Sequence, residues 1–116
     1  MYEFPLFGDE IIRRVWHDDE WWFDIEEVIS TFIDTEDVKG YIKTLRLTDE
    51  GLDKRYNEIV RVLNVITGDR IERADCANTE GIFRVIQSIN SSKVEPFKRW
   101  MAKLGKERID ELSEPD

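Results

Sequence analysis

The sequence predicts a single α+β domain in which small antiparallel β-hairpins form a sheet packed by about four to five helices. The chain has 116 residues, of which 41% are hydrophobic, and this is enough apolar material for one core. Two stretches of β-branched and aromatic residues each contain a turn, and several later stretches repeat apolar residues at helical spacing. We expect one domain over residues 1–116, with a core from about 11 to 109 and an acidic tail over 110–116.

The first predicted elements are a β-hairpin and the helix after it. Residues 11–16 and 21–23 are β-branched and aromatic, and the polar residues 17–20 between them are typical of a turn. A helix is predicted over 24–33, because apolar residues at positions 25, 28, 29 and 32 follow the i, i+3, i+4, i+7 spacing. Asp24 is placed to cap this helix, with Glu27 three residues later as in a capping box.

The middle of the chain predicts one more helix, a loop and a second hairpin. Apolar residues at 38, 41, 42 and 45 predict a helix capped by the Thr35 hydroxyl, although Gly40 costs up to about 1 kcal/mol relative to alanine. Residues 46–58 are polar without a clear period, so we expect a surface loop. Residues 59–66 and 70–76 flank the turn signal at 67–69 and predict the hairpin, while the first of them is equally compatible with a helix.

Two further helices are predicted in the last third. One begins after Asn78, a good cap, and carries apolar residues at 82, 85, 86 and 89. After a break at 90–92, the other carries apolar residues at 97, 100, 101 and 104. It begins either with a capping box at Ser92 or at Pro96, and we expect it to end at Gly105. A last short amphipathic piece carries Ile109 and Leu112.

The net charge of −9 argues against simple electrostatic attraction to nucleic acid over the whole surface. The charge is uneven, however. Residues 1–38 hold 12 acids against 2 bases, whereas residues 39–109 hold 10 acids against 15 bases. This asymmetry permits one basic face on an acidic protein, and the alternative is that the charges only solvate the surface.

Several classes of protein are disfavoured by what the sequence lacks. No stretch approaches the roughly 18 apolar residues of a membrane span, and acids stand at the amino terminus where a signal peptide has bases, so we expect a cytoplasmic protein without membrane contact. The single cysteine, Cys76, is expected to be a small strand or core residue. The single histidine, His17, lies in a turn without the spacing of a catalytic triad. We therefore expect no enzyme, no metal and no cofactor.

Three stretches resemble a known family when they are taken in order. They are residues 12–23, residues 78–88, and residues 92–100 with the element Phe97-Lys98-Arg99-Trp100. Together they resemble the Bro-N domain of baculovirus Bro proteins and prophage antirepressors, especially its DNA-damage-inducible D-like branch, over about residues 11–109. The resemblance implies an α+β domain in a phage-linked regulator, many of which are described as DNA-binding, and members commonly continue into a second, carboxy-terminal domain.

The candidate DNA contacts are basic side chains on two predicted helices. If the late helix buries its apolar stripe, its basic residues face away from that stripe and could lie along a phosphate backbone. The alternative for both helices is a solvated face. The candidates are Lys93, Lys98, Arg99, Lys103, Lys106 and Arg108 near the late helix, and Lys39, Lys43 and Arg46 on the second helix.

The alternative function is a protein-interaction module that captures a host or phage regulatory protein through an acidic, tryptophan-rich front. Side chains alternate along a strand, so Trp21 and Trp22 point to opposite faces and one of them is expected to be exposed. An acidic front of this kind can meet the basic surface of a DNA-binding protein. Its candidate contacts are Asp18, Asp19, Glu20 and Trp22. Self-association into a homo-oligomer is also possible.

Overall fold

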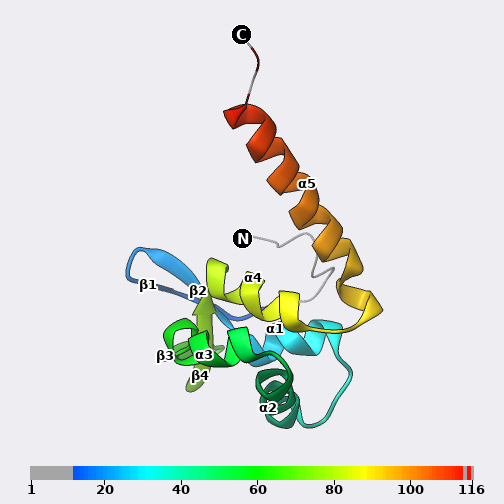
Figure 1. Cartoon of the computed structure of the whole chain (residues 1–116). Coiled ribbons are helices and arrows are strands. Elements are labelled where there is room, and N and C mark those ends of the chain that lie inside the picture. The colour runs from blue at the N-terminus through cyan, green and yellow to red at the C-terminus, as the bar shows by residue number, and fades with distance from the viewer. Residues whose placement is uncertain (1–11, 114, 116) are drawn as a thin grey trace.

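The computed structural model describes residues 12–113 and 115 (Figure 1). The sheet and four of the helices form a body, and the last helix projects from it (Figure 1). The elements in order are β1 (Arg14–His17), β2 (Glu20–Asp24), α1 (Ile25–Phe32), α2 (Val38–Thr48), α3 (Glu50–Ile59), β3 (Arg61–Thr67), β4 (Arg70–Asn78), α4 (Thr79–Ser88), the 3-10 helix η2 (Ser92–Val94) and α5 (Glu95–Leu112). The predicted α+β class is confirmed.

Both predicted hairpins are present, and they join into one curled antiparallel sheet with the strand order β1-β2-β4-β3. The first hairpin turns at Asp18 and Asp19, whose φ angles are 52° and 63°. Positive φ at both central residues matches the twist of the flanking strands, and aspartate tolerates it better than most side chains. The second hairpin turns at Gly68, where φ is 63°. The open choice between strand and helix for 59–66 is settled as a strand that begins at Arg61.

The main core lies between the sheet and the helices. α1 and α4 pack against β2 and β4, and their apolar stripes are buried as their spacing predicts. A second apolar cluster, built from Trp22, Val65 and Cys76, is formed by side chains of the strands themselves. α5 is fixed to the body by its first turn, where fully buried Phe97 packs edge-on against Phe83 with ring centroids 5.2 Å apart.

The predicted helix caps are confirmed in two places and wrong in one. Asp24 and Asn78 accept the backbone N–H groups of Glu27 and Gly81. The second half of the predicted capping box does not form at α1, because the Glu27 carboxylate accepts from Arg13 instead. α2 is capped by Asp37, which accepts from Gly40, so the cap at Thr35 was wrong. The Thr35 hydroxyl instead accepts a hydrogen bond from the backbone N–H of Asp37, the capping residue itself.

The expected loop over 46–58 is wrong, because this segment is helical. α2 continues to Thr48, Asp49 alone separates the two helices, and α3 runs from Glu50 to Ile59. The period is present but sparse. Leu52, Tyr56 and Ile59 fall at i, i+4 and i+7 and are the buried residues of α3, while polar side chains fill all its other positions except Gly51.

α5 also differs from its expected bounds. It begins at Glu95, one residue before Pro96, and no side chain caps it; Ser91 instead accepts from Lys93 to start η2. The helix continues through Gly105 to Leu112, so the expected end at Gly105 was wrong. A glycine ends a helix where it takes a left-handed conformation, and Gly105 is not among the positive-φ residues of the described chain. Residues 102–113 are exposed, and the piece carrying Ile109 and Leu112 is the outer end of α5.

Candidate nucleic-acid interface

The basic residues of the last helix lie on its solvent side. Arg99, Lys103 and Lys106 fall at i, i+4 and i+7 and share one face of α5, with Lys98 at the edge of this face. Lys93 precedes them in η2. Lys106 donates to Asp110 at 2.6 Å, which neutralises part of its charge.

Arg108 does not belong to this face. It follows Met101 and Leu104 at i+7 and i+4, so the helical period places it on the apolar side of α5. It also pairs with Glu111 at 3.1 Å. The candidates without an ion pair among the described residues are therefore Lys93, Lys98, Arg99 and Lys103.

The second group of candidates, on α2, is largely paired within the molecule. Lys39 contacts Glu26 at 2.9 Å, and this contact raises the pKa of the lysine. Arg46 contacts Asp53 at 2.8 Å. In the described structure, only Lys43 of this group has no ion pair.

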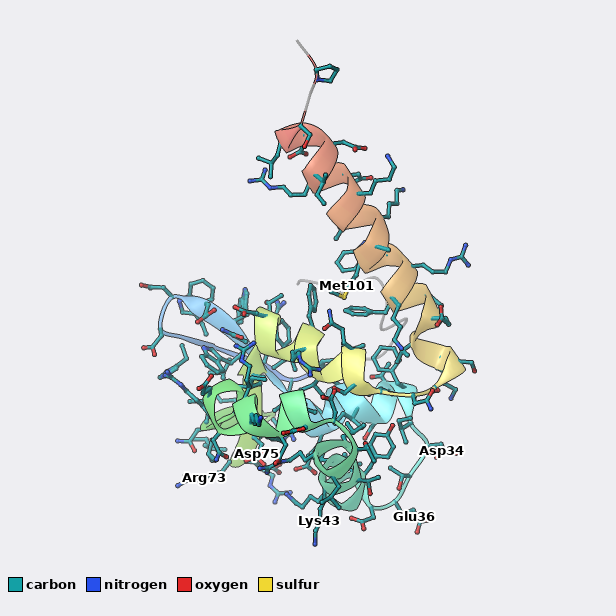
Figure 2. All side chains as sticks on the ribbon, in the orientation of Figure 1. Asp34, Glu36, Lys43, Arg73, Asp75 and Met101 are labelled. Carbon is teal, nitrogen blue, oxygen red and sulfur yellow. The ribbon has the colours of Figure 1, made fainter. Side chains whose placement is uncertain are left out.

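The structure does not bring the two groups of candidates together. In Figure 1, α5 extends from one end of the body and α2 lies at the other. Figure 2 shows Lys43 pointing outward at the end opposite α5. The two groups therefore do not form one continuous basic face.

The acidic, tryptophan-rich front is formed by the first hairpin. Trp22 is 4% exposed, donates its indole N–H to the His17 carbonyl oxygen at 2.9 Å and packs in the second core cluster. It is therefore a core residue and offers no surface to a partner. The opposite face of the hairpin exposes Trp16 and Trp21, 56% and 37% accessible, with their rings edge to face and 5.1 Å apart. The Arg14 guanidinium lies 4.2 Å over the Trp21 ring, so this face is aromatic and cationic beside the acidic tip.

The tip itself holds the other three predicted partner contacts. Asp18, Asp19 and Glu20 are exposed. Asp18 contacts Arg61 of β3 at 3.0 Å, and Glu20 accepts the Asn78 side-chain amide at 3.1 Å. Among these three, Asp19 has no hydrogen bond or ion pair to another described residue.

Comparison with known proteins identifies the family. A family model described as the N-terminal domain of the BRO family matches residues 11–108. The chain belongs to the BRO family. The Bro-N resemblance is thereby confirmed over almost the same residues that carry it in the sequence, and proteins of this family are in general phage or viral regulatory proteins. No curated protein and no solved structure matches the chain.

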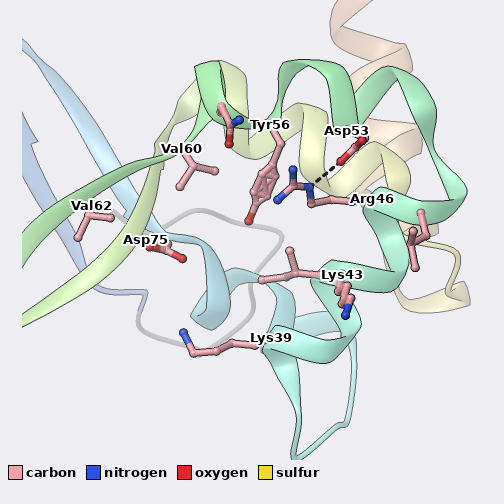
Figure 3. A pocket seen from close by; sticks show the side chains of 11 residues that line it. Lys39, Lys43, Arg46, Asp53, Tyr56, Val60, Val62 and Asp75 are labelled. Carbon is pink, nitrogen blue, oxygen red and sulfur yellow. Dashed lines mark hydrogen bonds and ion pairs between the residues drawn. The ribbon is translucent and has the colours of Figure 1, made fainter.

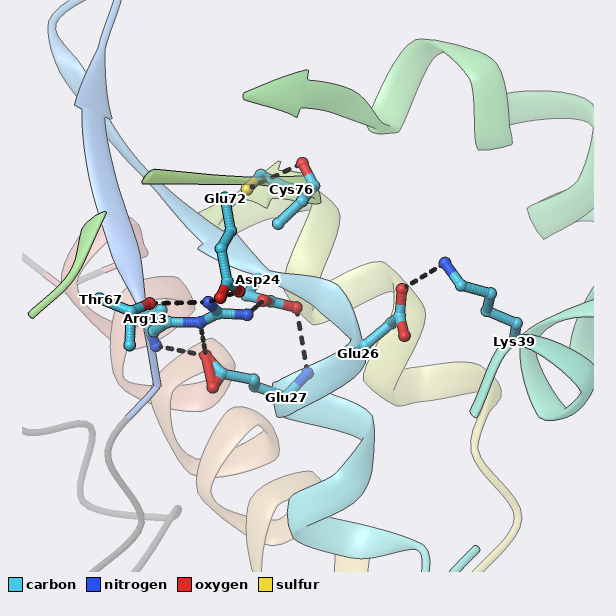
Figure 4. Close-up of polar contacts among 9 residues, drawn as sticks. Arg13, Asp24, Glu26, Glu27, Lys39, Thr67, Glu72 and Cys76 are labelled. Atoms are coloured by element: carbon cyan, nitrogen blue, oxygen red, sulfur yellow. Dashed lines mark hydrogen bonds and ion pairs between the residues drawn. The ribbon is translucent and has the colours of Figure 1, made fainter. Parts of the chain in front are cut away.

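A partly buried ion cluster around Arg13 holds this Bro-N domain together, and it was not predicted (Figure 4). The guanidinium donates to Asp24 at 2.7 Å, to Glu27 at 3.0 Å and to Glu72 at 2.9 Å. It also donates to the Thr67 hydroxyl at 2.8 Å. Hydrogen bonding to Glu72, with smaller contributions from the other carboxylates, raises the pKa of Arg13. The cluster links the residue before β1 with the end of β2, the start of α1 and the second hairpin, a structural role that no local pattern encodes.

A second unpredicted hub is Asp49, at the junction of α2 and α3. Its backbone N–H ends α2 by donating to Leu45, and its carboxylate starts α3 by accepting from Leu52. The same carboxylate accepts from Arg84 at 3.1 Å and from Ser88 at 2.6 Å, both on α4. Hydrogen bonding to Ser88, then to the Leu52 backbone, lowers the pKa of Asp49 to about 2.

The two remaining candidates for side-chain chemistry are Cys76 and His17. Cys76 is fully buried in β4, as expected, and burial raises the pKa of its thiol to about 11. His17 stays at the end of β1, where its imidazole lies 3.3 Å from Asp18. Within the described residues there is no cluster of histidine, cysteine and acidic side chains that could hold a metal ion. None of the helices there combines the length and apolar character that a membrane span requires.

Proposed function

We propose that this Bro-N domain is a regulatory DNA-binding domain that contacts the phosphate backbone through the basic face of α5. The observation that carries the proposal is the local charge. Residues 93–106 hold five bases against one acid, Glu95, in a chain whose net charge is −9. All of these bases except Lys93 lie on α5, which projects from the body, so a nucleic acid can approach them without meeting the acidic first hairpin. The acids Glu107, Asp110 and Glu111 follow them in the outer turns of the helix.

The proposed contact is made by charge and does not require a catalytic group or a cofactor. Four basic side chains without internal ion pairs would neutralise about four phosphates, so log K should fall with log salt with a slope of about −3 to −4. Such contacts position a protein on DNA and carry no sequence information directly. Transcriptional regulation by this domain would then take its specificity from a further element or from a partner protein.

The test is a fluorescence-anisotropy titration of a duplex of about 20 base pairs at about 50 and 200 mM salt. We expect binding at the lower salt, and a loss of about tenfold or more in affinity when Lys98 and Lys103 are both changed to glutamate. Lys43→Glu combined with Lys54→Glu is the matched control, because this double variant makes the same charge change on two exposed lysines away from α5. Absence of binding at the lower salt, or an equal effect of the control, would contradict the proposal.

A second candidate function is supported by the exposed tryptophans. Trp16 and Trp21 form an accessible aromatic pair beside the acidic hairpin tip, and aromatic residues with a polar rim are typical of protein interfaces. An antirepressor or DNA-damage-response factor could capture a regulatory protein with this face. Pull-down with the Trp21→Ala and Asp19→Lys variants, with and without nuclease, tests it. A partner that is lost with both variants and retained under nuclease supports it, whereas one that is released by nuclease supports the DNA proposal.

A further inference from the structure

A cleft of about 690 Å³ opens between α2, α3 and the second hairpin, at the end of the molecule opposite α5 (Figure 3). Its apolar wall includes Ile42, Val60 and Val62. Tyr56 points into the cleft from α3, and the Arg46 guanidinium lies 4.4 Å over its ring. The ring is thereby held in place, and the cleft is formed by side chains from three elements.

Further exposed apolar side chains lie along the second hairpin beyond this cleft. The register pairs Val62 with Asp75 and Ile66 with Ile71, so these side chains share the outer face of the β3–β4 ribbon. Ile66 and Ile71 are 73% and 71% exposed, and at the mouth of the cleft Leu47 is 77% exposed. Asn64 and Arg73 form the intervening pair on the same face, so this row mixes apolar and polar side chains. Exposed apolar side chains with polar neighbours are typical of surfaces that bind amphipathic partners.

The charged side chains that line the cleft are of both signs, and two of its three bases are ion-paired. α2 contributes Lys39, Lys43 and Arg46 to its lining, and residues 38–48 contain no acid. Lys43 has no ion pair among the described residues, and neither does exposed Arg73 on the outer face of the ribbon. Asp53 and Asp75 also line the cleft, so its interior is mixed while its α2 rim is cationic.

We propose that this cleft binds an acidic, amphipathic segment of a partner protein. An apolar anchor side chain fills the hollow between Ile42 and Val62, and carboxylates on either side of that anchor meet Lys43 and Arg73. A phosphate backbone fits less well, since it has no apolar group for Leu47 or Val62 and it would face Asp53 and Asp75 inside the cleft. This site is separate from the α5 face and does not depend on the proposed DNA binding.

The test is selection of peptides of about 12 residues from a random display library on the whole chain, with measurement of their affinities. We expect the selected peptides to combine a large apolar residue with flanking aspartate or glutamate. Lys43→Glu and Leu47→Ser should each weaken binding by about fivefold or more. Both positions are exposed, so neither change disturbs the core. Lys54→Glu is the matched control, because Lys54 is an exposed lysine of α3 that does not line the cleft.

Mapping by ¹⁵N chemical-shift changes separates the possible outcomes. Shifts at Leu47, Val62 and Ile71 on addition of an acidic selected peptide support the proposal. It is overturned if the selected peptides are basic, if no peptide is selected, or if Lys43→Glu and Lys54→Glu weaken binding equally. A DNA duplex could instead shift the same residues. If Lys43→Glu abolished those shifts, the cleft would be assigned to nucleic acid.

Discussion

Single side chains in this domain connect elements whose sequences give no sign of the connection. Asp49 lies in a polar stretch that is typical of a loop, yet its carboxylate caps α3 and accepts hydrogen bonds from two side chains of α4. An arginine at the start of a predicted hairpin, such as Arg13, is expected to be a surface residue. Its guanidinium nevertheless donates hydrogen bonds to three carboxylates and a hydroxyl. Caps such as Asp24 and Asn78 could be predicted because their partners lie three residues away. Partners that are 35 or more residues apart could not.

The depressed pKa of Asp49 predicts a pH-dependent stability. Its folded pKa of about 2 is lower than the ordinary 3.8, so the stability it contributes is present above about pH 4 and is lost as the pH falls through 2. Asp49→Asn keeps a cap but removes the charge. We expect this variant to be less stable by about 1–2 kcal/mol at pH 7, with the difference vanishing near pH 2. Urea denaturation at several pH values measures it. Asp34→Asn, at an exposed aspartate, is the control, and a pH-independent difference for Asp49→Asn would contradict the assignment.

The buried Cys76 thiol should be inert in the native protein. Its pKa of about 11 leaves fewer than about one thiol in a thousand ionised at pH 8, and the side chain is not accessible. A disulfide reagent added at pH 8 should therefore modify the cysteine only after denaturant is added. Rapid labelling of the folded chain would show that the curled sheet opens easily.

At the scale of the elements, a helix or strand could be predicted where many apolar residues recur at regular spacing, and it was missed where they are few. The hairpins, α1 and α4 follow from dense patterns and turn residues. α3 was missed because its three buried side chains lie among polar residues and Gly51, and the second half of α5 was missed because glycine commonly ends helices. Lys98, Arg99 and Lys103 were correctly placed on a helix, whereas Lys106 and Arg108 lie beyond its expected end at Gly105. Their separation from the α2 bases, and the cleft, depend on how distant elements pack and could not be inferred from spacing.

Gly105 lies within α5, and a substitution at this glycine tests whether the helix continues to Leu112. A Cβ added at Gly105 meets nothing within 4 Å, so Gly105→Ala should stabilise the protein or the outer half of α5 by about 0.5–1 kcal/mol. Circular dichroism should show increased helicity. The contrast is Gly81→Ala, because a Cβ at Gly81 would lie 2.7 Å from Ile59 and should be destabilising. No gain at Gly105 would mean that α5 ends before it in solution.

At the scale of the molecule, the fold consists of two hairpins and a helical layer that share one ion cluster. Within residues 12–113, the hairpins pair through Trp22, Phe23 and Asp24 on one side and residues 76–78 on the other. Arg13 reinforces this short junction, since its partners lie on β2, β4 and α1 and at the end of β3. The domain's resistance to unfolding should therefore depend strongly on this one guanidinium.

Removing that guanidinium should destabilise the whole domain. Arg13→Met leaves the Asp24 carboxylate, 4% exposed, without its cation and should cost about 3 kcal/mol or more. Adding Asp24→Asn should recover part of the loss, because the asparagine carries no unpaired charge and can still cap α1. Arg70→Met is the control, since Arg70 is 75% exposed and its change should cost less than about 0.5 kcal/mol. Denaturant midpoints measure all three. Equal losses for Arg13 and Arg70 would contradict the structural role.

The single-residue junction at Asp49 also restricts the length of the chain. Each residue added to a helix turns the residues after it by about 100° around the axis. One residue inserted next to Asp49 would rotate α3 relative to α2, take Tyr56 from beneath Arg46 and point Leu52 toward water. A Cβ added at Gly68 would meet nothing within 4 Å, so an insertion on the side of Gly68 away from Thr67 lengthens only the tip of the hairpin. We therefore expect natural changes of chain length to be accommodated near Gly68 and to be absent at the equally polar residues around Asp49.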